Sequence, residues 1–120
     1  MAADEPNLVG VWKGSAIAVH IGDTPYRKSD GEITFGEKQI EFTYTISQQK
    51  GPLFSGQMTA MDKSEVLIGS LQPDGKGGVM LDDDGQYAFT LPAPDRMDAC
   101  YSHMKPNSKV VTCWTLTKAN

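Results

Sequence analysis

The chain has 120 residues, of which 39% are hydrophobic and 22% are charged, and its formal net charge is −4. This length is enough for one domain with a buried core. The net negative charge and the scattered Lys and Arg residues exclude the basic surface that nucleic-acid binding needs. No apolar run approaches the ~20 residues that cross a bilayer, so no membrane span is predicted.

Residues 1–7 are predicted to form a flexible tail ahead of a single domain at 8–118. The start, MAADEPN, has neither the charged nor the apolar region of a signal peptide. AADEP is nevertheless typical of a mature secreted chain that begins just after a cleavage site. We therefore expect a periplasmic or secreted protein whose signal peptide has been removed, with an ordinary cytosolic start as the alternative.

The rest of the chain alternates apolar and polar residues with period two and shows no long helical periodicity. Turn sequences such as QQKGP, PDGKG, DDDG and KPNS divide it into short segments, and short connections make successive strands antiparallel neighbours. The predicted fold is all-β, an eight-stranded antiparallel up-and-down barrel without open edges, with a small β-sandwich as the alternative. The strands are expected at about 8–20, 39–48, 52–61, 65–72, 78–82, 86–92, 96–104 and 109–118, with a long insertion at 21–38 that carries a possible short strand, Ile33–Phe35.

Alternation also predicts which side chains face the interior of the barrel. Ile40, Phe42, Tyr44 and Ile46 share one face of their strand, and polar residues share the other. Both faces of the first strand are largely apolar. There we expect Trp12 to point inward, because a tryptophan gains most from burial.

The stretch GVWKG, Gly10–Gly14, places a Gly-x-Trp sequence at the start of the first strand. In this it resembles the calycin superfamily, which comprises the lipocalins, the fatty-acid-binding proteins and the avidins. The resemblance rests on Gly10, Trp12 and the expected number of strands. It implies a barrel whose floor is closed by Trp12 and whose open end accepts a small ligand.

The only two cysteines, Cys100 and Cys113, flank a turn at Pro106-Asn107. A four-residue loop centred on this turn sets Lys105 opposite Ser108 and therefore Cys100 opposite Cys113, within reach of a disulfide on the outer face. Two free thiols, or zinc ligation with further ligands, are the alternatives. A disulfide implies an oxidising compartment, which supports the periplasmic or secreted location.

The side chains most suited to binding a ligand are expected at one end of the predicted barrel. Odd strands run one way and even strands return, so His20 and His103 are expected at the same mouth with one strand between them. The predicted function is therefore binding of a small, partly apolar ligand at this open end. The expected ligand-binding residues are His20, Tyr44, Phe54, Tyr87, Tyr101, His103 and Trp114.

Two other interpretations of the same residues remain open. A divalent cation could bind at the mouth, with Asp82 and Asp84 of the DDDG turn as weak candidate ligands. Alternatively, DDDG is only a hairpin turn and the inward aromatic residues only form the core.

The sequence contains no nucleophile–base pair and no Gly-x-Ser-x-Gly or His-Glu-x-x-His motif, so neither catalytic residues nor a cofactor is predicted. The alternative function is that of an envelope protein that acts through surface contacts with a protein partner, such as a protease or lysozyme inhibitor. Its working segment would be 1–7 or 21–38. An open interior would favour the ligand, and a fully packed interior would favour the partner.

Overall fold

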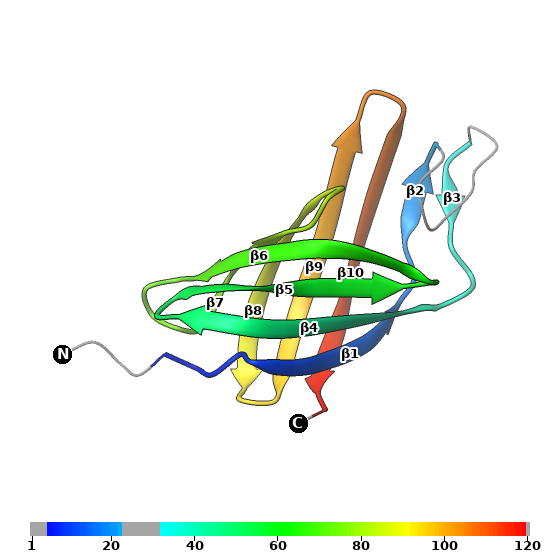
Figure 1. Cartoon of the computed structure of the whole chain (residues 1–120). Helices are drawn as coiled ribbons and strands as arrows, with labels where there is room; N and C mark the ends of the chain where they lie inside the picture. The colour runs from blue at the N-terminus through cyan, green and yellow to red at the C-terminus, as the bar shows by residue number, and fades with distance from the viewer. Residues whose placement is uncertain (1–4, 23–31, 120) are drawn as a thin grey trace.

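The computed structural model describes residues 5–22 and 32–119, which form strands and turns. Within this part of the chain, no helix has the length and apolar character that crossing a membrane requires. The predicted all-β barrel is confirmed: eight antiparallel strands close on themselves, and two short strands extend from the wall (Figure 1). The barrel strands are β1 (Gly10–Ala16), β4 (Ile40–Lys50), β5 (Leu53–Ala60), β6 (Lys63–Leu71), β7 (Gly77–Leu81), β8 (Gln86–Ala93), β9 (Arg96–Lys105) and β10 (Ser108–Lys118), and the additional strands are β2 (Val19–Ile21) and β3 (Thr34–Phe35).

The barrel closes where β1 meets β10. Trp12 lies opposite Lys118, and β1 also pairs with β4 along its whole length. Next to this contact β1 and β10 approach so closely that a Cβ atom at Gly14 would lie 2.2 Å from the carbonyl oxygen of Thr115. Because no residue with a side chain fits there, the second glycine of GVWKG permits the closure.

The first predicted strand, 8–20, is wrong in one respect, because the structure divides it into β1 and β2 at Ile17–Ala18. At this break the hydroxyl of Thr112 donates a hydrogen bond to the carbonyl oxygen of Ile17 (2.5 Å). The N–H of Gly36 donates to the carbonyl oxygen of Ala18 (2.8 Å). Both carbonyls are therefore satisfied outside the sheet ladder, and the alternation of faces continues into β2.

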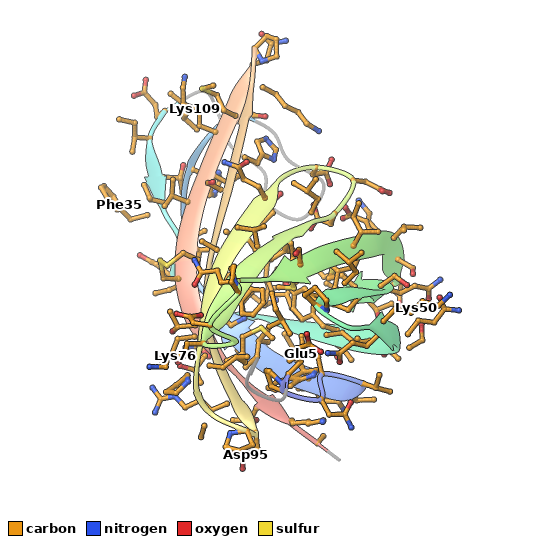
Figure 2. All side chains as sticks on the ribbon, turned by 90° about the vertical axis from the view of Figure 1, so that its left-hand side faces the viewer. Glu5, Phe35, Lys50, Lys76, Asp95 and Lys109 are labelled. Atoms are coloured by element: carbon orange, nitrogen blue, oxygen red, sulfur yellow. A yellow bond between two sulfur atoms is a disulfide. The ribbon has the colours of Figure 1, made fainter. Side chains whose placement is uncertain are left out.

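The short strand predicted in the insertion is confirmed as β3, which pairs with β2 at the edge of the sheet. Figure 2 shows Phe35 of β3 pointing away from the barrel, and 76% of this side chain is exposed. The remainder of the long insertion, at 23–31, lies outside the described residues.

The β9–β10 hairpin has the predicted register. Lys105 lies opposite Ser108 and Cys100 lies opposite Cys113. The two cysteines form a disulfide with their Cα atoms 4.0 Å apart, and both are exposed on the outer wall. The disulfide therefore ties two neighbouring wall strands together and leaves the interior to the alternate residues of each strand.

We call the end of the barrel with the turns at 61–62, 82–85 and 106–107 the histidine end, and the opposite end the floor. The floor is sealed by Leu8 and Trp12, which are 1% and 0% exposed, and the Trp12 Nε1 donates to the Leu8 carbonyl oxygen (2.9 Å). The side chain of Gln49 holds the segment before Leu8, because it accepts from the Leu8 N–H and donates to the Pro6 carbonyl oxygen. Flexibility of the whole tail, 1–7, stays a prediction, since residues 1–4 are not described.

Above this seal the interior is densely packed with apolar side chains. The predicted inward faces of β1 and β4 are confirmed, because Trp12, Tyr44 and Ile46 are each at most 1% exposed. Burial of such side chains is the main stabilising term of the fold. The other members of the core include Phe54, Met58, Leu67, Leu71, Met80, Phe89, Met97, Ala99 and Leu116.

Removing the disulfide should lower stability without changing the fold. We expect the double substitution Cys100→Ser, Cys113→Ser to lower the free energy of unfolding by ~3 kcal/mol, because the cross-link restricts the unfolded chain. Urea unfolding followed by circular dichroism measures the loss. Wild-type protein in reductant should show the same loss, and the double variant should show no further loss. An equal response of both proteins to reductant would contradict this prediction.

Candidate functional site

All seven predicted ligand-binding residues lie on the inward faces of their strands. Tyr101 and Trp114 are half-buried, and the other five are buried. They come from six strands: β2 (His20), β4 (Tyr44), β5 (Phe54), β8 (Tyr87), β9 (Tyr101, His103) and β10 (Trp114). Of these, β4 and β5 are neighbours, and β8, β9, β10 and β2 follow one another in the sheet.

Four of the predicted aromatic residues lie together in the structure, with Tyr87 at their centre. The ring centroid of Tyr87 lies 4.8 Å from that of Tyr101, 5.7 Å from that of Tyr44 and 6.1 Å from that of Trp114. Phe42, which the sequence analysis placed on the inward face without a binding role, joins the group at 5.9 Å from Trp114. We call these five residues the aromatic cluster.

Phe54 is not part of the aromatic cluster. Its ring centroid lies 6.1 Å from that of Phe89, and its ring occupies the space over Gly69, where a Cβ atom would come within 2.2 Å of it. Both neighbours belong to the wall and core nearer the floor. Phe54 thus packs in the core, and a contact between Phe54 and a ligand stays a prediction.

The two histidines lie at the same end of the barrel, as the strand directions predicted. Val110 of β10 pairs with His20 on one side and with His103 on the other, so their backbones are two strand spacings, about 10 Å, apart. His103 Nε2 lies 2.7 Å from the Ser108 hydroxyl. Burial, followed by the charge of Lys105, holds the pKa of His103 below its ordinary value of 6.5, so its imidazole is neutral at neutral pH.

A buried chain of hydrogen bonds runs from the aromatic cluster to the DDDG turn. The Tyr44 hydroxyl donates to the Tyr87 hydroxyl (3.0 Å), which in turn donates to Asp82 Oδ2 (2.5 Å). The other Asp82 oxygen accepts from the N–H groups of Asp84 and Gly85, each at 2.9 Å. The Asp82 carboxylate thus both shapes the turn and anchors the two tyrosines.

Both tyrosines of this chain stay protonated. Burial is the largest cause that raises the pKa of Tyr44 and of Tyr87 far above the ordinary value of 10.0. The negative charge of Asp82 raises both values further. The hydroxyl groups therefore act as neutral hydrogen-bonding groups near neutral pH.

The acidic residues near the DDDG turn have structural partners. Asp84 accepts a 2.8 Å ion pair from Lys105, and Glu65 Oε1 accepts from the Asp83 N–H (2.9 Å). Among residues 5–22 and 32–119, no group of three His, Cys, Asp or Glu side chains is placed to hold a metal ion. The hairpin-turn interpretation accounts for Asp82 and Asp84 without a bound cation.

Sequence analysis missed the roles of Glu65 and Asp82 in the interior. It gave Glu65 no role, whereas this residue is only 7% exposed. The alternation of β6 does contain the signal, since Glu65 is in phase with the buried Leu67 and Leu71. Outward-facing Val66 and Ile68 obscure it, because both faces of the strand are then partly apolar.

The interior changes character along its axis. Toward the floor it is apolar and packed. The buried polar residues of the described chain all lie on strands at or near the histidine end: His20, Glu65, His103, Ser108 and Thr112. Four inward apolar or aromatic residues there also remain only half-buried: Ile40, Phe42, Tyr101 and Trp114. At the histidine end these four inward side chains are therefore less covered than the buried core residues, as far as the described residues show.

Two nitrogen atoms in this region are buried without a hydrogen-bond partner in the described part of the structure. They are His20 Nδ1 and Trp114 Nε1. Buried polar groups are nearly always paired in folded proteins, because an unpaired one costs ~1–3 kcal/mol. Their presence on inward faces at the histidine end marks a place where a bound molecule would complete the bonding.

A cleft of about 690 Å³ opens beside His20. It lies between the segment before β4 and the turn that joins β5 to β6, and Ile40 and Ala60 form part of its apolar lining. Its volume is in the range of small-molecule sites. The cleft gives His20 a route to the surface at the histidine end.

A second depression, of about 800 Å³, lies on the outer wall. It runs over β6 to β9 and is lined by exposed apolar residues, among them Ile68, Val79 and Leu81, and by Cys100. Its lining also includes the inward-facing Tyr87 and Tyr101 of the aromatic cluster.

Comparisons with known proteins do not assign the chain to a family. No protein-family model matches the chain, and no curated protein matches its sequence. A similar solved structure is the S-type phycobiliprotein lyase CPES from Guillardia theta, at 10% identity and a TM-score of 0.47, with 94% of this chain and 89% of that chain covered. A likeness at this level carries no argument about ligand or activity.

The hydrogen-bonded chain from Tyr44 through Tyr87 to Asp82 predicts which of two substitutions lowers stability more. Tyr87→Phe should lower the free energy of unfolding by ~1–3 kcal/mol, because it leaves both the Tyr44 hydroxyl and one Asp82 oxygen without their partner. Tyr44→Phe should cost less, since the bond between Tyr87 and Asp82 remains. Chemical denaturation of the two variants measures the difference, and a larger loss for Tyr44→Phe would refute the proposed direction of the chain.

The lowered pKa of His103 predicts a loss of stability in acid. Below the ordinary value of 6.5 the unfolded chain takes up a proton before the folded chain does, so stability falls as the pH falls. His103→Gln should reduce this dependence between about pH 7.5 and about pH 5. Thermal unfolding across that range tests the expectation, and parallel curves for wild type and variant would contradict it.

Proposed function

We propose that this barrel binds a small, partly apolar organic ligand in its lumen at the histidine end. The observation that carries the proposal is the pair of buried nitrogens without partners, His20 Nδ1 and Trp114 Nε1. His20 lies on β2 and Trp114 on the neighbouring strand β10, and both residues face inward. A ligand with matching polar atoms would offset the cost of leaving them unpaired.

The aromatic cluster supplies the apolar part of the proposed site. Tyr101 and Trp114 are half-buried, whereas Tyr44 and Tyr87 are buried and hydrogen-bonded. Aromatic faces that are held rigidly by neighbours lose little conformational entropy when a flat molecule stacks on them. The cluster thus favours a ligand with at least one planar apolar portion.

The proposed location is the periplasm or the extracellular space. The Cys100–Cys113 disulfide supports it, because such bonds persist in oxidising compartments. The alternative function, contact with a protein partner through 1–7 or 21–38, stays a prediction, because much of both segments lies outside the described residues.

The proposal is tested by recovering the ligand from protein made in its native compartment. Native mass spectrometry should show a bound organic mass that is lost on denaturation. His20→Ala and Trp114→Leu should lower the bound fraction roughly tenfold or more, in line with ~1.4 kcal/mol or more per lost contact. Val19→Thr, an exposed neighbour of His20 on the same strand, is the matched control and should leave occupancy unchanged.

Two outcomes would count against the proposal. The first is wild-type protein without any bound organic mass. The second is a ligand whose occupancy does not change when His20, Trp114 or His103 is substituted, which would place binding elsewhere. His103→Ala also separates the two functions, since it should weaken a lumenal ligand and leave contact with a protein partner unaffected.

A further inference from the structure

We infer that the cleft beside His20 holds the polar half of the ligand, and that this half is a hydroxyl-rich group such as a sugar. This inference rests on the proposed function, because it names the class of molecule that the histidine end would take. It follows from a buried histidine in the wall of the cleft, from the mixture of side chains around it, and from the position of the cleft beside the aromatic cluster.

His20 marks the cleft as a place for a bound polar group. The residue is 5% exposed, it forms part of the lining of the cleft, and its Nδ1 atom has no hydrogen-bond partner in the described part of the structure. An imidazole nitrogen donates or accepts a hydrogen bond depending on the tautomer. A hydroxyl group can do either, so it satisfies Nδ1 in both tautomers, whereas a carbonyl or an ether satisfies only the N–H form.

Other polar side chains of the cleft suit a ligand with several hydroxyl groups. Thr43 and Thr59 are cross-strand partners on β4 and β5, so their side chains are neighbours in the lining. Gln39 adds an amide group and Glu41 a carboxyl group. Hydroxyl and amide groups both donate and accept, and a carboxyl group bonds to a hydroxyl in either protonation state. The match therefore does not depend on the charge of Glu41.

The cleft also has an apolar side that suits the C–H face of a sugar ring. Ile40, Ala60 and Met61 belong to its lining. Removing C–H groups from water against these side chains supplies the apolar share of the binding free energy. An apolar wall combined with a few hydrogen-bonding groups is typical of small-molecule sites. The lining thus matches a molecule that has both hydroxyl groups and an apolar face.

The cleft adjoins the aromatic cluster along β4. Ile40 of the cleft and Phe42 of the aromatic cluster are alternate residues on the inward face, about 7 Å apart along the strand, and both are half-buried. Phe42 in turn packs against Trp114, with their ring centroids 5.9 Å apart. A ligand whose hydroxyl-rich end lies beside His20 can therefore place a flat apolar end on the aromatic cluster. An aryl glycoside has this form.

A matched set of naphthalene probes tests the hydroxyl-rich half. The glycosides are the 2-naphthyl derivatives of glucose, galactose and N-acetylglucosamine, and 2-methoxynaphthalene keeps the ring and lacks the sugar. Fluorescence titration of wild-type protein freed of ligand should show at least about tenfold tighter binding of one or more glycosides than of 2-methoxynaphthalene. His20→Phe keeps an aromatic ring without the nitrogens and should reduce this ratio to within a few-fold of one.

The position of the sugar in the cleft is tested with two isosteric substitutions. Thr43→Val removes a hydroxyl group from the lining and should weaken binding of the preferred glycoside several-fold. Thr45→Val makes the same change on the same outward face of β4 but outside the cleft, so it is the matched control and should leave binding unchanged. Equal losses for the two variants would overturn the placement. Thermal unfolding of each variant confirms that it is folded before titration.

The outcomes separate this inference from the proposed function. Equal affinity for the glycosides and for 2-methoxynaphthalene, with an organic molecule bound to the native protein, would overturn the hydroxyl preference and leave the lumenal site intact. Failure of every probe to bind would also overturn the inference. If the native protein then carries no organic ligand either, the proposed function fails with it.

Discussion

The register of the β9–β10 hairpin is the constraint on which the site depends. Because side chains alternate across a strand, setting Cys100 opposite Cys113 on the outer wall also directs Tyr101, His103, Thr112 and Trp114 inward. A slip of one residue would move the sulfur atoms into the lumen and the imidazole into solvent. The covalent bond and the hydrophobic pattern therefore specify the same register, and the interior at the histidine end follows from it.

The two ends of the barrel differ in the side chains that face the interior. At the floor, Leu8 and Trp12 seal a core in which protein atoms fill the available space. At the histidine end, polar side chains occupy inward positions, so complete packing would leave them unpaired. The Tyr44–Tyr87–Asp82 chain shows how most of these groups are satisfied within the protein. His20 and Trp114 are the positions where that internal pairing is incomplete.

Two acidic side chains beside the interior, Asp82 and Glu65, have a structural role in the DDDG turn. Asp82 shapes a tight turn through two backbone N–H bonds, and Glu65 accepts a third from the same turn. Asp82 also accepts from the Tyr87 hydroxyl, so the geometry of the turn and the position of the buried tyrosines are coupled in this fold.

The sequence by itself determined the all-β class, the antiparallel strand order, the inward faces and the cysteine pairing, because each of these depends on period-two alternation and on short turns. It also placed both histidines at one end, since strand direction alone decides that. Only the tertiary structure decided the break of the first strand at Ile17–Ala18, the burial of Glu65 and the separation of Phe54 from the aromatic cluster. It alone revealed the unpaired Trp114 nitrogen. These features arise where side chains from strands distant in sequence compete for the same interior space, and a one-dimensional pattern carries no information about which of them meet.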